Sequence, residues 1–231
     1  MMNDLLTQST FFGVMISLAA YGLGIVLRKK TRLAVCNPLL IAIAVTIAVL
    51  VAIGMDYDTY YQSAQYLSYL LTPATVCLAV PLYQQLSLLR KNWKAIVGGI
   101  VAGVLTSLVS VLAMARLFGL NHEEYVTLLP KSITTAIGMG VSEELGGYVT
   151  ITVAVIIITG VLGNMIASTV CKIARIHDPI ARGIGIGSAS HAIGTTRAME
   201  LGEIEGAMSS LSIAVAGLLT VVGASVFASL M

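Results

Sequence analysis

Three ionisable residues, His191, Arg197 and Glu200, lie in a stretch of the chain that is otherwise apolar or small. Residues 187–203 read GSASHAIGTTRAMELGE, which contains too many glycine, serine and threonine residues for an ordinary membrane-spanning helix. Ionisable groups are costly inside a bilayer, and they usually mark a functional site there. The stretch therefore predicts a polar, interrupted membrane element with a functional role.

A second stretch upstream resembles this one. Residues 135–146 read TAIGMGVSEELG and residues 191–202 read HAIGTTRAMELG, and they match without gaps at six of twelve positions. Both copies interrupt apolar sequence with polar groups, and both precede a long apolar run. We interpret them as a weak internal repeat, and we expect the functional site where the two copies meet.

The side chains of the two copies are suited to binding a small carboxylate. Interrupted helices expose backbone N–H groups at internal N-termini, where the helix dipole favours anions. Hydroxyl groups add neutral donors, and a lysine or arginine supplies a full positive charge. A histidine titrates near neutral pH and could couple transport to protons. The predicted substrate-binding residues are Lys131, Ser132, Thr134, Thr135, Ser188, Ser190, His191, Thr195, Thr196 and Arg197.

Each of these residues also has a purely structural interpretation. Lys131 and Arg197 could extend to a membrane interface, and His191 could simply donate to a backbone carbonyl. Serine and threonine in membrane helices commonly bond to their own backbone. Glutamates at the ends of segments are commonly solvated, and Glu200 is the exception of most interest because it aligns with Glu144 in the repeat.

The composition indicates an integral membrane protein. Of the 231 residues, 57% are hydrophobic and 10% are charged, whereas a soluble domain has about 25% charged residues. We predict an all-α, polytopic helical membrane protein with about seven to eight membrane segments and discontinuous or re-entrant helices in a weak inverted repeat. We expect a single integral membrane domain over residues 1–231. The net charge of +2 does not indicate nucleic-acid binding.

The apolar runs give the predicted segments. They are Phe11–Leu27, Leu39–Ile53, Leu67–Leu89, Ala95–Phe118, Tyr125–Gly147, Val149–Cys171, Gly183–Glu203 and Ala207–Met231. Asn37 and Pro38 open the second run, because proline suits the first turn of a helix. Pro73 and Pro81 interrupt the third run. Residues 55–65 are predicted to be a tyrosine-rich interfacial loop.

The basic residues constrain how the two repeat copies enter the membrane. Placing Arg28–Arg32 and Arg90–Lys94 on the inner side satisfies the positive-inside rule. If Tyr125–Gly147 and Val149–Cys171 both crossed the membrane, the basic run Lys172–Arg182 would lie outside. The conflict disappears if residues 125–147 enter the membrane and return, so that the two copies enter from opposite sides. Inverted repeats with broken helices are typical of secondary transporters.

The sequence contains no pattern typical of an enzyme, a cofactor site or a metal site. Gly183, Gly185 and Gly187 lack the spacing of a dinucleotide-binding loop, and no Walker, hydrolase or metalloprotease motif occurs. Cys36, Cys77 and Cys171 lack the spacing of metal ligands. We therefore expect no enzymatic activity, no cofactor and no metal.

Several short motifs resemble the LrgB/CidB family along nearly the whole chain. They are Asn37-Pro38-Leu39-Leu40, Pro81-Leu82-Tyr83, Leu129-Pro130-Lys131-Ser132 with Thr134-Thr135, and Gly187-Ser-Ala-Ser-His-Ala-Ile-Gly-Thr195. The chain departs from the family pattern at Ala136, where relatives often have proline. The resemblance implies an antiholin-like regulator of murein hydrolase activity and cell lysis in a bacterial inner membrane. It also implies a small membrane partner of the LrgA/CidA type.

The resemblance also implies a transport function. A related plastid protein is a glycolate/glycerate transporter, bacterial relatives are linked to pyruvate uptake, and the family resembles transporters with broken helices. Our leading hypothesis is a carrier or facilitator of small monocarboxylates linked to lysis control. The alternative is a regulatory subunit that transports nothing. We expect the lipid bilayer, the LrgA/CidA-like protein and a small organic anion as partners, with a homo-oligomer possible.

Overall fold

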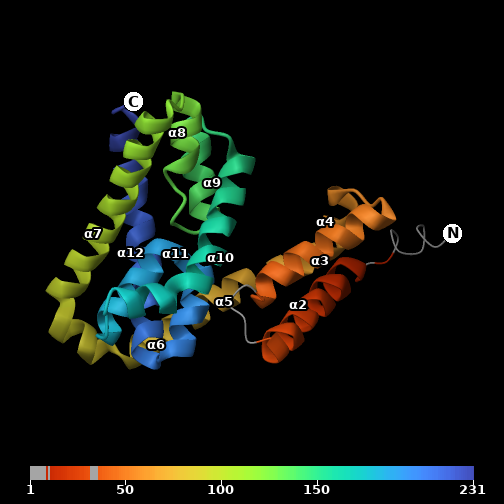
Figure 1. Cartoon of the computed structure of the whole chain (residues 1–231), viewed down its shortest axis with the longest axis horizontal. Coiled ribbons are helices and arrows are strands. Elements are labelled where there is room, and N and C mark those ends of the chain that lie inside the picture. The colour runs from red at the N-terminus through yellow and green to blue at the C-terminus, as the bar shows by residue number, and fades with distance from the viewer. Residues whose placement is uncertain (1–8, 10, 32–35) are drawn as a thin grey trace. The chain divides into compact units, whose positions relative to one another are not determined.

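The computed structural model describes residues 9, 11–31 and 36–231, and within these ranges the only regular secondary structure is helical. The chain divides into two compact units, Met1–Cys77 and Leu78–Met231 (Figure 1). We call them unit 1 and unit 2. The described residues therefore confirm the predicted all-α class, while the single domain over residues 1–231 stays a prediction.

Unit 1 is a small helical assembly in which α2 packs against α3 and α4. Its helices are α2 (Phe12–Thr31), α3 (Pro38–Ile53), α4 (Tyr57–Ser68) and α5 (Leu71–Cys77). Asn37 caps α3 as its neighbouring proline predicts, because its side chain accepts from the backbone N–H groups of Leu39 and Leu40 at 2.8 and 3.3 Å.

The prediction of a loop over residues 55–65 is wrong, because most of this stretch is helix α4. Asp56 is the N-cap of α4, where its carboxylate accepts from the backbone N–H of Thr59 at 3.1 Å and from its hydroxyl at 2.6 Å. The tyrosines that suggested an interfacial loop instead follow helical spacing, and the ring centroids of Tyr57 and Tyr61 lie 5.8 Å apart.

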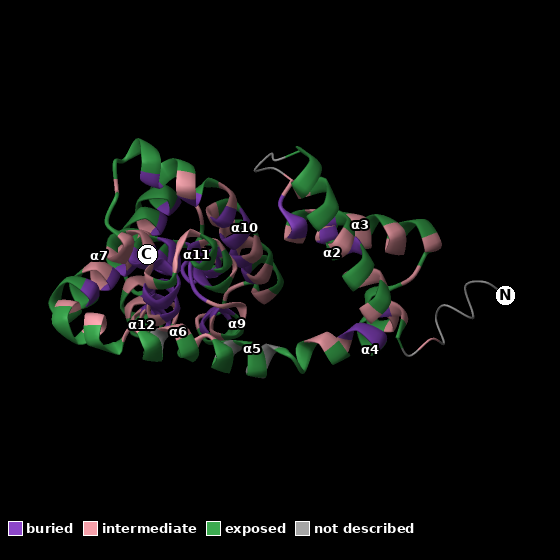
Figure 2. Ribbon diagram, turned by 90° about the horizontal axis from the view of Figure 1, so that it is seen from below, coloured by how far each residue is buried: buried purple, intermediate pink, exposed green. Residues whose placement is uncertain are grey.

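The hydrophobic core of unit 2 is formed mainly by α7, α12 and the stretch from α8 to α9, and α11 packs against α7 and α12 (Figure 2). Its helices are α6 (Ala79–Gln84), α7 (Leu86–Phe118), α8 (His122–Leu128), α9 (Thr135–Glu144), α10 (Val149–Ile173), α11 (Pro179–Leu201) and α12 (Glu203–Ala228). The buried face of α7 carries Ile96, Ile100, Val104 and Leu108 at four-residue spacing. This spacing places them in one stripe along the helix.

The first repeat copy lies in a hairpin made of α8, a turn and α9, which we call hairpin 1 (residues 122–148). The Tyr148 hydroxyl donates to Glu123 at 2.6 Å, and its backbone N–H donates to the Thr127 hydroxyl at 2.8 Å. Both ends of the hairpin therefore lie at the same end of unit 2, which is also where Tyr125 donates to the carbonyl of Phe227 near the C-terminus (Figure 1). This confirms that residues 125–147 return to the end from which they start.

The second repeat copy lies in α11, which is broken at His191 (φ 41°, ψ −143°) into a first half (residues 179–190) and a second half (residues 192–201). Gly187 in the first half packs against Ser209 of α12. Thr195 in the second half also contacts Ser209, at 2.7 Å. The chain therefore turns back at the break, and we call residues 179–202 hairpin 2.

The two hairpins enter unit 2 from opposite ends. The 25 residues of α10 connect them, and at 1.5 Å per residue this helix is about 37 Å long, enough to cross a bilayer. One crossing between two hairpins reverses the direction from which the second hairpin enters. The fold thus has the inverted arrangement that the sequence repeat predicts.

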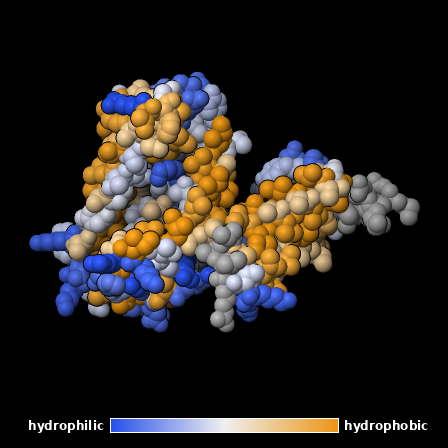
Figure 3. All heavy atoms as spheres, in the orientation of Figure 1, coloured by the Kyte–Doolittle hydropathy of each residue, from blue (hydrophilic) through white to orange (hydrophobic). Residues whose placement is uncertain are grey.

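Four helices in the described ranges are long and apolar enough to span a membrane, namely α2, α7, α10 and α12, and α3 is a shorter apolar helix. On the face of unit 2 drawn in Figure 3, hydrophilic residues gather at the upper and lower edges, and the zone between them is largely hydrophobic but contains a more polar area near its middle. The chain is an all-α membrane protein, but the count of seven to eight membrane segments is not confirmed. The third predicted run, Leu67–Leu89, is not one segment, because it covers the end of α4, all of α5 and α6 and the start of α7. Pro73 and Pro81 lie in the first turns of α5 and α6.

Candidate functional site

The tips of the two hairpins lie close together on α7. The Ser132 hydroxyl, at the tip of hairpin 1, lies 3.1 Å from the Ser107 hydroxyl of α7. In hairpin 2, the Ser188 hydroxyl lies 2.8 Å from the position that a Cβ on Gly103 would occupy. Gly103 and Ser107 are one helical turn apart, about 6 Å along the axis of α7. The tips therefore approach each other in the middle of unit 2.

Ile156 of α10 contacts both hairpins. Its side chain packs against Gly138 in α9, and its backbone carbonyl lies 3.0 Å from Nε2 of His191 at the break in α11. Ile156 is therefore a residue of α10 that links the two hairpins.

The two half-helices begin at nearly the same depth along α12. In hairpin 1, Gly217 of α12 packs against Ile137, two residues after the start of α9. In hairpin 2, Ser209 of α12 contacts Thr195, four residues after His191. At 1.5 Å per residue, these contacts place the two helix starts within about 3 Å of the same depth. Thr134 occupies the N-cap of α9 without making a side-chain capping bond.

Lys131 is a cation at the tip of hairpin 1. Its ammonium donates to the Ser132 hydroxyl at 3.0 Å, and its side chain is half-buried. Within the described parts of the chain, no carboxylate forms an ion pair with Lys131. A cation that lacks a protein counter-ion inside a membrane protein is available to an anionic ligand.

His191 is buried, with 2% of its surface exposed. Because a carbonyl only accepts, Nε2 must carry the proton in its bond to Ile156. Gly160 makes room for the ring, since a Cβ there would lie 2.7 Å from Cε1 of His191. The contact with a backbone carbonyl matches the structural interpretation of His191, while proton coupling stays a prediction.

Two hydroxyl groups near the break, those of Ser188 and Thr195, bond to the backbone of α11 itself. Ser188 donates to the carbonyl of Ile184 at 2.6 Å, within its own helix. Thr195 donates to the carbonyl of His191 at 2.9 Å and also contacts Ser209. Both bonds run from a side chain to the carbonyl four residues earlier, as serine and threonine in membrane helices commonly do.

Two predicted site residues, Thr196 and Arg197, lie against α10 instead of at the hairpin tips. Asn164 donates to the Thr196 hydroxyl at 2.8 Å. Arg197 donates to the Ser168 hydroxyl at 2.9 Å and pairs with Glu200 at 2.6 Å. Arg197 is six residues beyond the break, about 9 Å along the second half of α11. The two predicted cations therefore have different surroundings: Lys131 lies at the tip of hairpin 1, and Arg197 lies against α10 and forms an ion pair.

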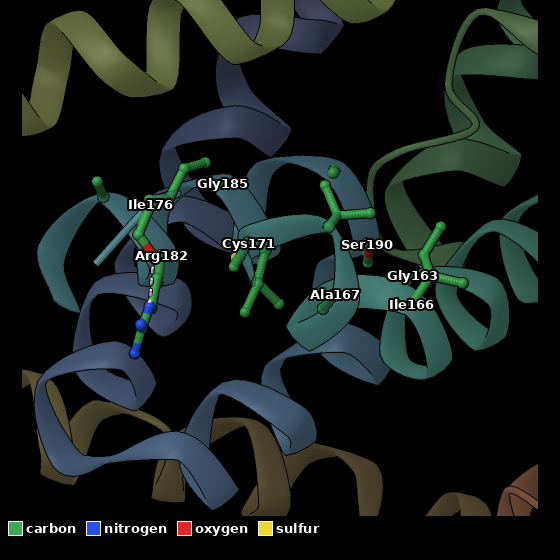
Figure 4. Close-up of a pocket in the computed structure, with 12 residues that line it drawn as sticks. Gly163, Ile166, Ala167, Cys171, Ile176, Arg182, Gly185 and Ser190 are labelled. Carbon is green, nitrogen blue, oxygen red and sulfur yellow. Dashed lines mark hydrogen bonds between the residues drawn. The ribbon is translucent and has the colours of Figure 1, made fainter. Parts of the chain in front are cut away.

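Ser190 faces a different environment, an apolar cavity of about 250 Å³ between α10 and the first half of α11. Figure 4 shows Ser190 towards one side of this cavity and Arg182 towards the other, with Ala167 and Cys171 between them. Arg182 donates to the carbonyl of Ile176 at 2.9 Å and pairs with Glu205 at 3.7 Å. The cavity offers few polar partners to a small anion.

Four polar residues that contact the predicted site were missed in the sequence. They are Ser107, Asn164, Ser168 and Ser209. Asn164 could have been identified from the sequence, because an amide within an apolar run needs hydrogen-bond partners in a membrane. The contact with the carbonyl of Ile156 could not have been predicted, because a backbone carbonyl is present at every position.

Comparison with known proteins gives one consistent result. A family model described as the LrgB-like family matches residues 17–230. The chain is 36% identical over 217 residues to the antiholin-like protein LrgB of Bacillus mycoides, and 35% identical over 217 residues to proteins of the same name from Bacillus cereus and Bacillus anthracis. Each alignment covers 94% of both chains. No solved structure matches the chain.

Proposed function

The chain belongs to the LrgB-like family, and from this premise we propose that it is a secondary carrier or facilitator of small monocarboxylates. The family consists of membrane proteins and is not an enzyme class. Two broken-helix hairpins that enter from opposite ends are a common architecture of secondary transporters, with the substrate between them. Unit 2 has this arrangement.

The observation that carries the proposal is the position of Lys131. Its ammonium group lies at the hairpin tip beside Ser132 and makes no ion pair among the described residues. A carboxylate bound there would neutralise the ammonium and accept from nearby hydroxyl and backbone N–H groups. The start of α9, directly after Thr134, adds positive partial charge from its exposed N–H groups.

His191 and Thr195 have a supporting role in this proposal. They hold the break in α11 open by bonding to backbone carbonyls and to Ser209. The break places the start of the second half of α11 at the depth of the start of α9. Two helix N-termini at one depth favour an anion more than either alone, because their partial charges add.

A second candidate function is regulation without transport. The relatives named above are called antiholin-like proteins, and that name favours a subunit that controls lysis through a partner. The partner proposed from the family resemblance is a small membrane protein of the LrgA/CidA type, in the bacterial inner membrane. Control of murein hydrolase activity and assembly into a homo-oligomer belong to the same proposal.

Uptake into proteoliposomes distinguishes the two candidates. We would measure labelled pyruvate, glycolate and lactate uptake with and without the small partner, across an imposed pH gradient. The variants are Lys131→Gln, which removes the charge, and His191→Gln, which keeps a side-chain donor at the break. Glu143→Gln, at an exposed position near the end of α9, is the control.

A carrier predicts saturable uptake that the control variant retains and that Lys131→Gln weakens. Absence of uptake of all three acids by monodisperse protein, with and without the partner, would contradict the carrier. Absence of uptake, together with control of lysis in cells that carry the same protein, would establish the regulatory subunit instead.

A further inference from the structure

The second half of α11 packs against α10 through polar side chains. We call Asn164, Ser168, Thr196, Arg197 and Glu200 the polar seam. Asn164 donates to the Thr196 hydroxyl at 2.8 Å and to the carbonyl of Ile193 at 2.9 Å. One turn further along α10, the Ser168 hydroxyl accepts from Arg197 at 2.9 Å, and Arg197 pairs with Glu200.

The seam follows one face of α10. Asn164 and Ser168 are four residues apart and therefore lie in one row along the helix. Gly160 continues this row to His191, because a Cβ there would lie 2.8 Å from Nε2. The row thus runs from the break in α11 to the end of unit 2 at which hairpin 2 begins and ends.

The opposite face of α10 has the character of a lipid-facing surface. Ile158, Leu162 and Ile166 are 56%, 49% and 51% exposed, and they lie on the side of the helix away from the seam at 100° per residue. Aliphatic residues suit contact with acyl chains, whereas the ion pair and amide of the seam do not.

Part of the seam is nevertheless open. Thr196 and Glu200 are exposed, and Ala192, the first residue of the second half of α11, is exposed as well. These three residues are four apart and form one row on the helix. Exposed polar groups at membrane depth require water or protein beside them.

We propose that the polar seam lines a water-filled vestibule that leads small hydrophilic anions to the break at His191. Arg197 and Glu200 lie at its mouth, where the guanidinium attracts carboxylates and Glu200 competes with them. Arg197 is thus a positioning residue on the path, and Lys131 lies at the end of it. This inference rests on the proposed function, since a path to the break needs a solute that uses it.

Cysteine labelling in proteoliposomes tests the vestibule without measuring transport. Alanine first replaces the native residues Cys36, Cys77 and Cys171. The resulting cysteine-free protein gives the background level of labelling. Thr196→Cys places a thiol in the seam, and Leu162→Cys places one on the opposite face of α10, about 3 Å in depth from Asn164. The probe is a hydrophilic, anionic methanethiosulfonate present on both sides of the membrane.

Thr196→Cys should react at least about tenfold faster than Leu162→Cys, because hydrocarbon disfavours the thiolate and excludes the probe. Pyruvate should slow the reaction at Thr196→Cys. Thr196→Cys loses the hydrogen bond between Thr196 and Asn164. Ala192→Cys therefore serves as a second variant, because the alanine side chain that it replaces makes no hydrogen bond. Monodisperse elution in detergent establishes that each variant is folded.

Equal, background-level reaction of Thr196→Cys, Ala192→Cys and Leu162→Cys in folded protein would overturn the vestibule. Uptake that persists in that case would leave the carrier intact with a different path. Fast seam labelling by protein that takes up no acid would establish the vestibule and contradict the carrier.

Discussion

Replacing Lys131 with glutamine should weaken uptake while it stabilises the protein. The substitution keeps a hydrogen-bond donor beside Ser132 but removes the positive charge. In the absence of substrate this charge has no ion-pair partner among the described residues. Its loss therefore removes a cost of desolvation from the folded protein and removes an attraction from the bound complex.

The size of both effects follows from the contacts. A hydrogen bond to a charged group contributes about 1.5–3 kcal/mol, so the KM for a monocarboxylate should rise about 10- to 150-fold. Relief of about 1 kcal/mol of desolvation cost raises Tm by about 2–4 °C in a unit of this size. Lower affinity with higher stability is the combination expected of a residue kept for binding.

The assay pairs uptake kinetics in proteoliposomes with thermal unfolding in detergent for the wild type, Lys131→Gln and Lys131→Arg. Arginine keeps the charge, so its KM should stay within about tenfold of the wild-type value because only the donor geometry changes. A purely structural role for Lys131 predicts a lower Tm for the glutamine variant. An unchanged KM together with a lower Tm would refute our reasoning.

Three further predictions follow from individual contacts. Gly160→Ala should cost about 1–3 kcal/mol by displacing the histidine at the break, whereas Gly98→Ala, with open space around it, should stabilise by up to about 1 kcal/mol; equal unfolding midpoints would contradict this. Asn164→Ala should destabilise by about 1–3 kcal/mol in denaturant titrations, because it removes two hydrogen bonds, one to the carbonyl of Ile193 and one to the hydroxyl of Thr196. The bond to Glu123 raises the pKa of Tyr148 above its usual 10.0, so this contribution to stability is present at neutral pH and is lost as the pH rises through the raised pKa. Glu123→Gln should shift the Tyr148 titration, followed by ultraviolet difference absorbance against Tyr148→Phe, to lower pH; an unmoved titration would show that the bond is absent in solution.

The arrangement of the two hairpins could be predicted from the sequence because it depends on local patterns. The repeat aligns Thr135, the first residue of α9, with His191, the site of the break. The basic run after α10 required the first copy to return, and the bonds between Tyr148 and residues 123 and 127 show that it does. Helix α9 begins at Thr135 although position 136 is alanine and not proline.

The pairing of the site residues could not be predicted, because it depends on helix rotation. The sequence did not show that Arg197 would face Ser168 and Glu200, or that Lys131 would have no ion-pair partner among the described residues. Hairpin 2 turns the second half of α11 towards α10, and no residue type encodes that rotation by itself. Helix α4 was missed for a different reason, since the tyrosines of residues 55–65 favoured an interfacial loop, although Asp56 is the N-cap of a helix.

Counterflow is the most direct test of a carrier. Proteoliposomes are loaded with unlabelled pyruvate and diluted into a trace of labelled pyruvate, with Lys131→Gln protein as the comparison. A site that opens alternately to each side predicts that the label accumulates transiently above its external concentration, and that Lys131→Gln reduces this overshoot. Equilibration without an overshoot would indicate a pore, and the absence of label uptake by folded protein would contradict transport altogether.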